Sequence, residues 1–339
     1  FLSSFVMGQH PSELINFRSI EDINFDVFSD SEYEYRSFYN KTYDTEDFAN
    51  NFFLPWNYIK ETDSKVVELI WNEYFSYDKG IAAKGGGCYT GNYQKYTDDL
   101  LEEINNNIPQ NRETFLDVVD YGITISSTNI RRLPTDEFCL KRIRNAGEGY
   151  PFDELQYTSI WIGTPIVILE KSNDNIWYFV QSTYSKGWVK AESIALTDKS
   201  QREFIINSPK KVIVSDGVII NTKSTPIRLK LGTLLPSLPN SNELLIPAKS
   251  YSGSKLFFDT VRINSVGIKE FPIEFNEDNV KLVLSELIEG KYSWGGIDGG
   301  RDCSSTLKDY FTLFGIWIPR NSWAQSMSGD TTNLEVLKN

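Results

Sequence analysis

Histidine is almost absent from this sequence of 339 residues, which contains only His10. Cysteine is also scarce: the three are Cys88, Cys139 and Cys303, and no two of them form a Cys-x-x-Cys pair. Because a zinc site usually takes four cysteine or histidine ligands at close spacing, we expect no metal site, and we expect no cofactor. Cys88 and Cys139 can pair in a disulfide bond, but the sequence does not show whether they do.

Long apolar runs and excess positive charge are missing too. A membrane-spanning helix needs about 20 consecutive apolar residues, whereas the longest apolar runs here have the length of a β-strand. We therefore expect no transmembrane span. The 34 Lys and Arg are outnumbered by 46 Asp and Glu, so that the net charge is −12. Nucleic-acid binders usually carry a basic surface, and nucleic acid is therefore not expected as a partner.

What is present is the composition of a folded protein, 40% hydrophobic and 14% aromatic, long enough for several domains. Residues 1–111 are rich in Asn, Asp, Glu, Tyr and Phe. Helical spacing appears in KVVELIWNEYF, residues 65–75, and predicts that four apolar side chains share one face. These are Val66, Leu69, Ile70 and Phe75. We expect residues 1–111 to form a mainly helical region.

Short strands follow this region in two consecutive blocks. PIVILEK (165–171) and IWYFVQS (176–182), joined by the turn-rich SNDN, predict a hairpin, and GWVKAES (187–193) predicts a third strand. In the second block, strands are expected in KVIVSD, GVIINT and LLIPAKS, and SDG (215–217) predicts a hairpin turn between the first two. Two small β-barrels, residues 112–200 and 201–270, are predicted; one larger β-sandwich is the alternative.

Two helices are predicted after the strands. The first begins after Asn276, a good N-cap followed by acidic residues, and ends at Gly290. Its apolar stripe is Val280, Val283, Leu284, Leu287 and Ile288. The second begins after Asp302 and ends at Gly315, and its apolar stripe is Leu307, Tyr310, Phe311 and Phe314.

Cys303 falls in the first turn of the second helix. Unpaired backbone N–H groups and the positive end of the helix dipole stabilise a thiolate there, and the Cys303 N–H itself can donate to an oxyanion. The preceding WGGIDGGR allows close approach of the backbone, as a cleft or a tight turn requires. Two interpretations follow from these residues: a catalytic nucleophile, or a buried cysteine in a core helix.

The stretch YSWGGIDGGRDCSS, with GIWIPRNS after it, resembles the signature of the NlpC-type cysteine peptidases. These papain-like enzymes cut the stem peptides of bacterial peptidoglycan. The matching positions are Tyr292, Trp294, Gly295, Gly296, Asp302, Cys303, Ser304, Gly315, Pro319, Arg320 and Ser322.

The resemblance extends upstream. NIRRLPT (129–135), PFDELQY (151–157) and YSKGWV (184–189) resemble the first bacterial SH3-like barrel of multidomain members, and KLGTLLP (230–236) with LLIPA resembles the second. FFLPW (52–56) resembles their N-terminal stabilising domain. The resemblance thus implies a multidomain α+β protein: a stabilising domain (1–111), two SH3-like barrels, and the start of a papain-like peptidase domain (271–339).

The resemblance also assigns roles to single residues. Cys303 matches the nucleophile, and Tyr292 matches a tyrosine that helps the Cys303 N–H to hold the oxyanion. The positions matching substrate-binding residues are Asp302, Ser304 and Ser322 for the D-glutamyl group, with Trp294 and Tyr184 at the cleft. Asn321 stands where related enzymes often carry an aspartate for the free amine of L-Ala. Tyr292 and Trp294 can also be ordinary core aromatics, and Arg320 is expected to be structural.

A cysteine peptidase also needs an imidazole to activate the thiol. In the NlpC-type family this histidine lies downstream of the cysteine, but no histidine follows Cys303 here, and His10 lies far upstream. The apolar stripe of the second helix also lacks a sheet to cover it. We therefore expect this sequence to be part of a longer enzyme, the remainder being lost, omitted or present as another chain.

The leading hypothesis is an endopeptidase of the bacterial cell envelope, periplasmic or secreted, that cleaves the γ-D-glutamyl–diamino acid bond of stem peptides or muropeptides. The alternative is a non-catalytic peptidoglycan-binding protein with an inactive peptidase-like domain. The missing histidine favours the alternative, whereas the matches at Tyr292, Asp302, Cys303, Ser304 and Ser322 favour the enzyme.

Overall fold

In the computed structural model, the described residues are 43, 45–75, 87–145, 148–223, 225–250, 253–263 and 266–328. Helices precede the first strand, as expected: α1 (Glu46–Phe52), the short η5 (Leu54–Asn57), α2 (Ser64–Tyr74) and α4 (Asp98–Asn106). Trp56, in the FFLPW motif, is buried and donates from Nε1 to the carbonyl oxygen of Gly122 at 3.0 Å. The beginning of the predicted helical region, including His10, lies outside the described residues.

The predicted face of α2 is partly wrong. Val66 and Leu69 are 38% and 68% exposed, whereas Trp71 and Phe75 are buried and contact Phe115. Apolar residues occur on several sides of this helix, so that spacing alone does not identify the buried side. The bulky aromatic rings bury the most surface, and they determine which side faces the core.

The first block of strands forms one antiparallel seven-stranded sheet in the order β3-β2-β6-β5-β4-β1-β7. Its strands are β1 (Asp120–Thr124), β2 (Thr128–Arg131), β3 (Gln156–Ile160), β4 (Pro165–Lys171), β5 (Trp177–Ser182), β6 (Lys186–Lys190) and β7 (Ile194–Leu196). The predicted hairpin is confirmed, because β4 pairs with β5 from Ile166–Ser182 to Lys171–Tyr178. The predicted third strand is β6, and the short η6 (Ala191–Ser193) follows it.

The second block forms three small sheets, with the orders β11-β8-β14, β10-β9 and β12-β13. Its strands are β8 (Lys210–Ile213), β9 (Val218–Asn221), β10 (Pro226–Leu229), β11 (Leu234–Pro236), β12 (Glu243–Lys249), β13 (Leu256–Arg262) and β14 (Ile268–Glu270). Helix α5 (Lys199–Asn207), which the sequence analysis did not predict, separates the two blocks. The strands of each sheet thus come from one block, and an isolated parallel bridge between Leu196 and Lys255 connects the two blocks.

The hairpin predicted at SDG is wrong, because β8 and β9 pair with other strands and not with each other. Gly217 does adopt a turn conformation, with φ +80°. The side chain of Asp216, however, accepts a hydrogen bond from the Leu231 N–H and pairs with Arg301. Asp216 in this turn therefore contacts distant segments of the chain. After the turn, the chain enters a different sheet as strand β9.

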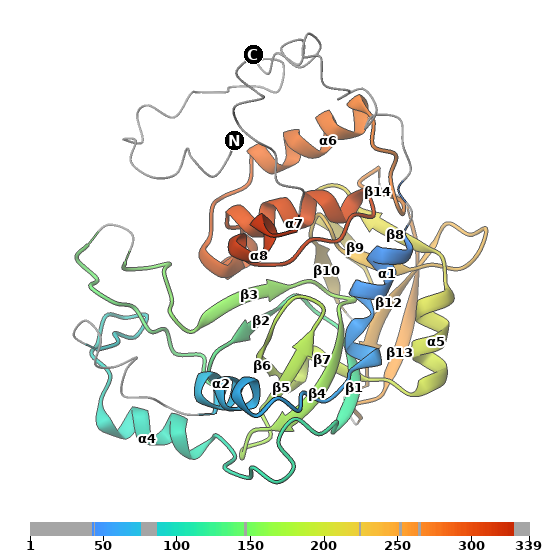
Figure 1. The fold of residues 1–339 in the computed structure, drawn as a ribbon. Helices are drawn as coiled ribbons and strands as arrows, with labels where there is room; N and C mark the ends of the chain where they lie inside the picture. The colour runs from blue at the N-terminus through green and yellow to red at the C-terminus, as the bar shows by residue number, and fades with distance from the viewer. Residues whose placement is uncertain are drawn as a thin grey trace.

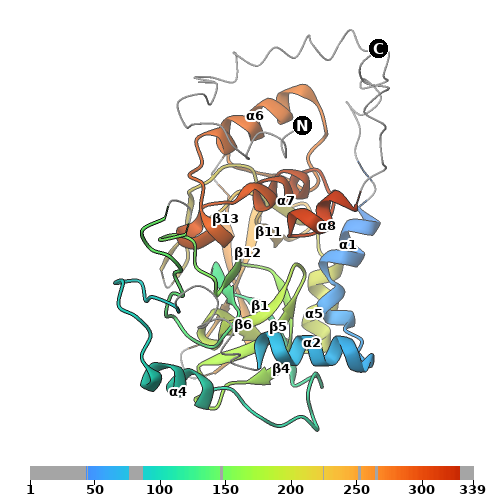
Figure 2. The ribbon, with the colours of Figure 1, turned by 60° about the vertical axis from the view of Figure 1, so that its left-hand side comes forward.

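The C-terminal helices lie together over one end of the sheets in both views (Figures 1 and 2). They are α6 (Glu277–Ile288), the short η7 (Trp294–Gly299), α7 (Cys303–Leu313) and α8 (Ser322–Ser326). The start of α6 is confirmed: the Asn276 side chain accepts from the Asn279 N–H. Ile288, predicted on its apolar stripe, is instead 47% exposed.

The apolar stripe predicted for α7 is also partly wrong. Phe314 is buried, but Leu307 and Phe311 are only half-buried. The buried side of the helix is largely polar and consists of Ser304, Ser305, Lys308, Asp309 and Thr312. Polar side chains are stable inside a protein when hydrogen bonds or ion pairs satisfy them, and α7 meets that condition.

A shared hydrophobic core connects the segments. Phe48 and Phe52 of α1, Val283 of α6, and Phe314 belong to one cluster of buried side chains. Cys88 and Cys139 form a disulfide bond that joins a segment before α4 to the loop between β2 and β3. In the part of the chain that the structure describes, no helix is both long and apolar enough to cross a membrane.

Candidate active site

The glycine-rich turn before Cys303 packs directly on strand β3. Gly295 and Gly296 have φ of +56° and +78°, and a Cβ on them would lie 2.6 Å from the Gln156 Cγ and 2.9 Å from the Ser159 Cβ. The same neighbours bind the turn: Gln156 donates to the Gly295 carbonyl at 3.0 Å, and Ser159 donates to the Gly296 carbonyl at 2.7 Å. Glycine is therefore required at both positions by conformation and by space.

Cys303 is the first residue of α7 and its side chain is exposed. Since the other two cysteines of the sequence form the disulfide, Cys303 carries the only free thiol. The first N–H groups of an α-helix have no partner within the helix, and they give the helix start a positive electrostatic potential. The thiol thus lies at the surface, where backbone donors can stabilise a negative charge.

The carboxylate of Asp302 organises this helix start. Asp302 is the N-cap of α7 and forms a capping box with Ser305. It accepts five hydrogen bonds, with donors Ser304 Oγ, Ser305 N, Gly295 N, and Arg320 Nη1 and Nη2. Burial would raise the pKa of Asp302, but the charge and hydrogen bonds of Arg320 outweigh burial and hold that pKa below its usual range.

Tyr292 is paired with the segment that leads into Cys303. It forms a parallel bridge with Arg301, two positions before Cys303, and its side chain is 58% exposed. Partial burial raises the pKa of Tyr292, and the negative charge of Asp302 adds to this effect. The structure thus joins Tyr292 to Arg301, two positions before Cys303, and the raised pKa keeps the phenol protonated.

The other predicted site residues differ in accessibility. Ser304 is buried, donates to Asp302 and accepts from Arg320 Nη1 at 2.8 Å. Asn321 is exposed and caps α8 by accepting from the Ala324 N–H at 2.8 Å; Ser322, the first residue of α8, is also exposed. Asn321 and Ser322 are therefore accessible to a ligand, whereas the hydrogen-bonding groups of Ser304 are already engaged.

Trp294 and Tyr184 contact different segments of the chain. Trp294 is 39% exposed and donates from Nε1 to the carbonyl oxygen of Asp153 at 3.1 Å. Tyr184 follows β5 and lies beside Lys308, whose Nζ is 4.5 Å from the ring centroid. Burial raises the pKa of Tyr184. Tyr184 therefore packs against the middle of α7, beyond the turn that carries Cys303.

Two arginines bind side chains at the start of α7 or within it, and only Arg320 was singled out from the sequence. Arg320, expected to be only structural, binds Asp302 and also donates to the Thr158 hydroxyl at 2.6 Å. Arg301 was not predicted at all. One signal in the sequence was available: polar residues recur at helical spacing in α7, at Ser304, Lys308 and Thr312 and at Ser305 and Asp309.

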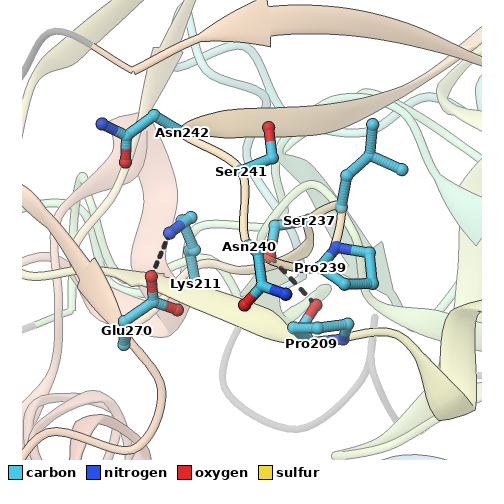
Figure 3. Close-up of a pocket in the computed structure, with 9 residues that line it drawn as sticks. Pro209, Lys211, Ser237, Pro239, Asn240, Ser241, Asn242 and Glu270 are labelled. Atoms are coloured by element: carbon cyan, nitrogen blue, oxygen red, sulfur yellow. Dashed lines mark hydrogen bonds and ion pairs between the residues drawn. The ribbon is translucent and has the colours of Figure 1, made fainter.

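A separate pocket of about 560 Å³ lies on the second block of strands, and none of the predicted site residues lines it. Figure 3 shows the side chain of Lys211 directed toward Glu270 there, with Ser237 beside Pro209. Among the described residues, no group of three or more His, Cys, Asp and Glu side chains is placed to hold a metal ion.

Comparison with known proteins bears on the fold of the chain. A family model described as an SH3 domain of the SH3b1 type matches residues 139–190, within the first predicted barrel. A solved NlpC/P60 endopeptidase from Photobacterium damselae subsp. piscicida matches with a TM-score of 0.75 and 24% identity, over 89% of this chain and 69% of that chain. A solved NlpC/P60 family protein from Bacillus cereus ATCC 10987 gives a TM-score of 0.45 and 16% identity, over 64% of this chain and 79% of that one.

A search of curated proteins finds no match. The chain therefore has the multidomain α+β fold of the first of these endopeptidases and contains an SH3 domain. The predicted resemblance is confirmed for the fold.

Proposed function

We propose that this chain is a cysteine endopeptidase of the NlpC/P60 type that cleaves the γ-D-glutamyl–diamino acid bond of peptidoglycan stem peptides. The observation that carries the proposal is the exposed thiol of Cys303 at the start of α7, with Tyr292 paired to Arg301 two residues before it. The fold shared with a solved endopeptidase supports the same reaction class.

In the proposed reaction, the Cys303 thiolate attacks the γ-carbonyl carbon of the D-glutamyl residue. The carbonyl π-electrons move to oxygen, and this oxyanion accepts hydrogen bonds from the Cys303 N–H and the Tyr292 hydroxyl. The C–N bond then breaks, the diamino acid leaves with a proton on its amine, and a thioester remains. Water hydrolyses the thioester and regenerates the thiol.

Proton transfer in both steps requires a base, and an imidazole is the usual group. The sequence contains one histidine, His10, which lies outside the described residues. The proposal therefore requires an imidazole from outside the part of the chain that the structure describes.

Substrate recognition is proposed at the exposed groups around the thiol. Asn321 and Ser322 are accessible, and Gln325 of α8 holds that helix to α7 through the Ser304 carbonyl at 2.8 Å. Asp302 already accepts five hydrogen bonds, so we expect it to act on the substrate mainly through the geometry of the helix start. Because Asn321 is neutral, we do not expect a strict requirement for a free L-Ala amine.

The cell envelope is the proposed location, either the periplasm or outside the cell. A disulfide that closes a separation of 51 residues is typical of an oxidising compartment. The SH3 domain is proposed to hold the wall-derived peptide near the cleft, so that stem peptides or muropeptides are the partners.

The test is digestion of muropeptides by the full chain and by Cys303→Ala. The proposal predicts cleavage that is lost in the variant, while binding of muropeptides is retained. Equal binding with no cleavage by either protein would support the non-catalytic, peptidoglycan-binding alternative. Equal cleavage by both would exclude Cys303 as the nucleophile.

A further inference from the structure

Arg301 lies two residues before the thiol, and its guanidinium is buried with an exposure of 6%. Its Nε is 2.6 Å from Asp309 Oδ2 on α7, and its Nη1 is 2.5 Å from Asp216 Oδ2 in the turn between β8 and β9. Nη2 donates to the Leu231 carbonyl at 3.0 Å. One side chain therefore joins the nucleophile helix to the second block of strands.

The backbone of the same residue holds the segment that carries Tyr292. The Ser293 N–H donates to the Arg301 carbonyl at 2.9 Å, and the Arg301 N–H donates to the Lys291 carbonyl at 3.4 Å. These bonds form the parallel bridge between Tyr292 and Arg301. The position of Tyr292 relative to Cys303 therefore depends on where Arg301 is anchored.

The anchor is a buried network of charges. Asp309 is fully buried and also accepts from Lys308 at 2.5 Å and from Trp161 Nε1 at 3.2 Å. Burial would lower the pKa of Arg301, but Asp309 and Asp216 outweigh it and raise that pKa, so that the guanidinium stays charged. A charged guanidinium that is bound by Asp309, Asp216 and the Leu231 carbonyl has little freedom to move.

We propose that Arg301 is a positioning residue, which fixes the Tyr292 hydroxyl and the Cys303 N–H at the distance needed to hold one oxyanion between them. This role rests on the proposed function, since it concerns the geometry around the nucleophile. A purely structural role would stabilise the fold without affecting the chemistry of the thiol. The two roles are therefore separated by a measurement on Cys303 itself.

The measurement is the rate at which iodoacetamide alkylates the folded protein, since Cys303 is the only free thiol. Arg301→Gln removes the buried cation and loosens the helix start that stabilises the thiolate, and we expect alkylation to slow about tenfold. Arg301→Lys keeps the charge but loses the fork geometry, and should give an intermediate rate. The matched control is Lys211→Gln, which also removes a buried cation, with Glu270 as its lost partner. It should leave the alkylation rate unchanged.

An unchanged alkylation rate in folded Arg301→Gln would overturn the proposal. Where Arg301→Gln does not fold, Asp216→Asn serves instead, because it keeps the Arg301–Asp309 pair and the hydrogen bond to the Leu231 carbonyl and removes only the negative charge of Asp216. It should slow alkylation measurably, and an unchanged rate there would overturn the proposal equally.

The alkylation assay needs no substrate, so its outcome is independent of whether the protein cleaves muropeptides. When cleavage is measured, we expect kcat to fall in Arg301→Lys with little change in KM, because the oxyanion forms only in the transition state. A change in KM alone would contradict the positioning role.

Discussion

Arg320 holds both oxygens of Asp302, with Nη1 3.0 Å from Oδ1 and Nη2 2.6 Å from Oδ2. The same guanidinium donates to Thr158 on β3 at 2.6 Å. Because Asp302 is the N-cap of α7, this two-pronged ion pair connects the helix start, the loop after α7 and the first sheet. The start of α7 is thereby held by Arg320 through Asp302, while Arg301, two residues before Cys303, is bound by Asp309 and Asp216.

Arg320→Gln should destabilise the protein strongly. The pair is buried, with side-chain exposures of 8% and 13%, and removal of one partner from a buried pair costs about 3–5 kcal/mol because the other charge is left uncompensated. Urea unfolding gives the free-energy difference directly. The control is Lys281→Gln, whose pair with Glu277 is exposed on α6; it should cost at most about 0.5 kcal/mol. Equal losses of unfolding free energy in the two variants would contradict a stabilising role of the buried Arg320–Asp302 pair.

The same ion pair predicts a pH dependence. The pKa of Asp302 is lowered in the folded protein, so its contribution to stability is complete above its unfolded pKa, about 3.9, and is lost as the pH falls through the folded value. The advantage of the wild type over Asp302→Asn in unfolding free energy should therefore shrink between pH 7 and pH 3. If the advantage is the same at both pH values, the ion pair is not its source.

Gly296→Ala should disturb the site as well as the fold. The added Cβ would lie 2.9 Å from the Ser159 Cβ, in a backbone with φ +78°, and the left-handed conformation alone costs about 1–2 kcal/mol. We expect a loss of at least about 2 kcal/mol in unfolding free energy and a changed alkylation rate at Cys303. Gly253→Ala, whose Cβ would meet only the Ser250 hydroxyl, is the control. A fully stable Gly296→Ala would show that the turn is not packed on β3 as described.

Loss of the disulfide should lower stability without removing the site. The bond between Cys88 and Cys139 spans 51 residues, and the loop-entropy relation gives about 4 kcal/mol for a closed loop of that length. The double variant Cys88→Ser/Cys139→Ser should show this loss in urea unfolding at pH 7. Its Cys303 alkylation rate under native conditions should match that of the wild type. If the double variant had the same unfolding free energy as the wild type, the disulfide would not constrain the unfolded chain.

The sequence predicted the elements that depend on interactions between residues close together in the chain. Asn276 with its acidic neighbours marked the start of α6, and Asp302 marked the start of α7, because capping depends on residues within one turn. The β4–β5 hairpin was equally local, since a short turn connects two apolar strands. The resemblance around Cys303 supplied the fold and the candidate nucleophile.

The features that the sequence did not predict depend on contacts between residues far apart in the chain. The polar side of α7 is buried because Asp309 meets Arg301, Lys308 and Trp161, and no spacing in the sequence reveals that Trp161 will be there. The strands on either side of Asp216 fail to form a hairpin for a related reason, since Asp216 binds Arg301 from 85 residues away. The disulfide partners could be counted but not paired, because pairing depends on their distance in the folded chain.

Cleavage through Cys303 is tested most directly by mass spectrometry of the full-length enzyme, with the imidazole that the reaction requires, mixed with the tripeptide L-Ala–γ-D-Glu–diaminopimelate. We expect release of free diaminopimelate and of L-Ala–γ-D-Glu, with an L-Ala–γ-D-Glu acyl group found transiently on Cys303. Intact tripeptide after incubation, or cleavage products without dependence on Cys303, would contradict it.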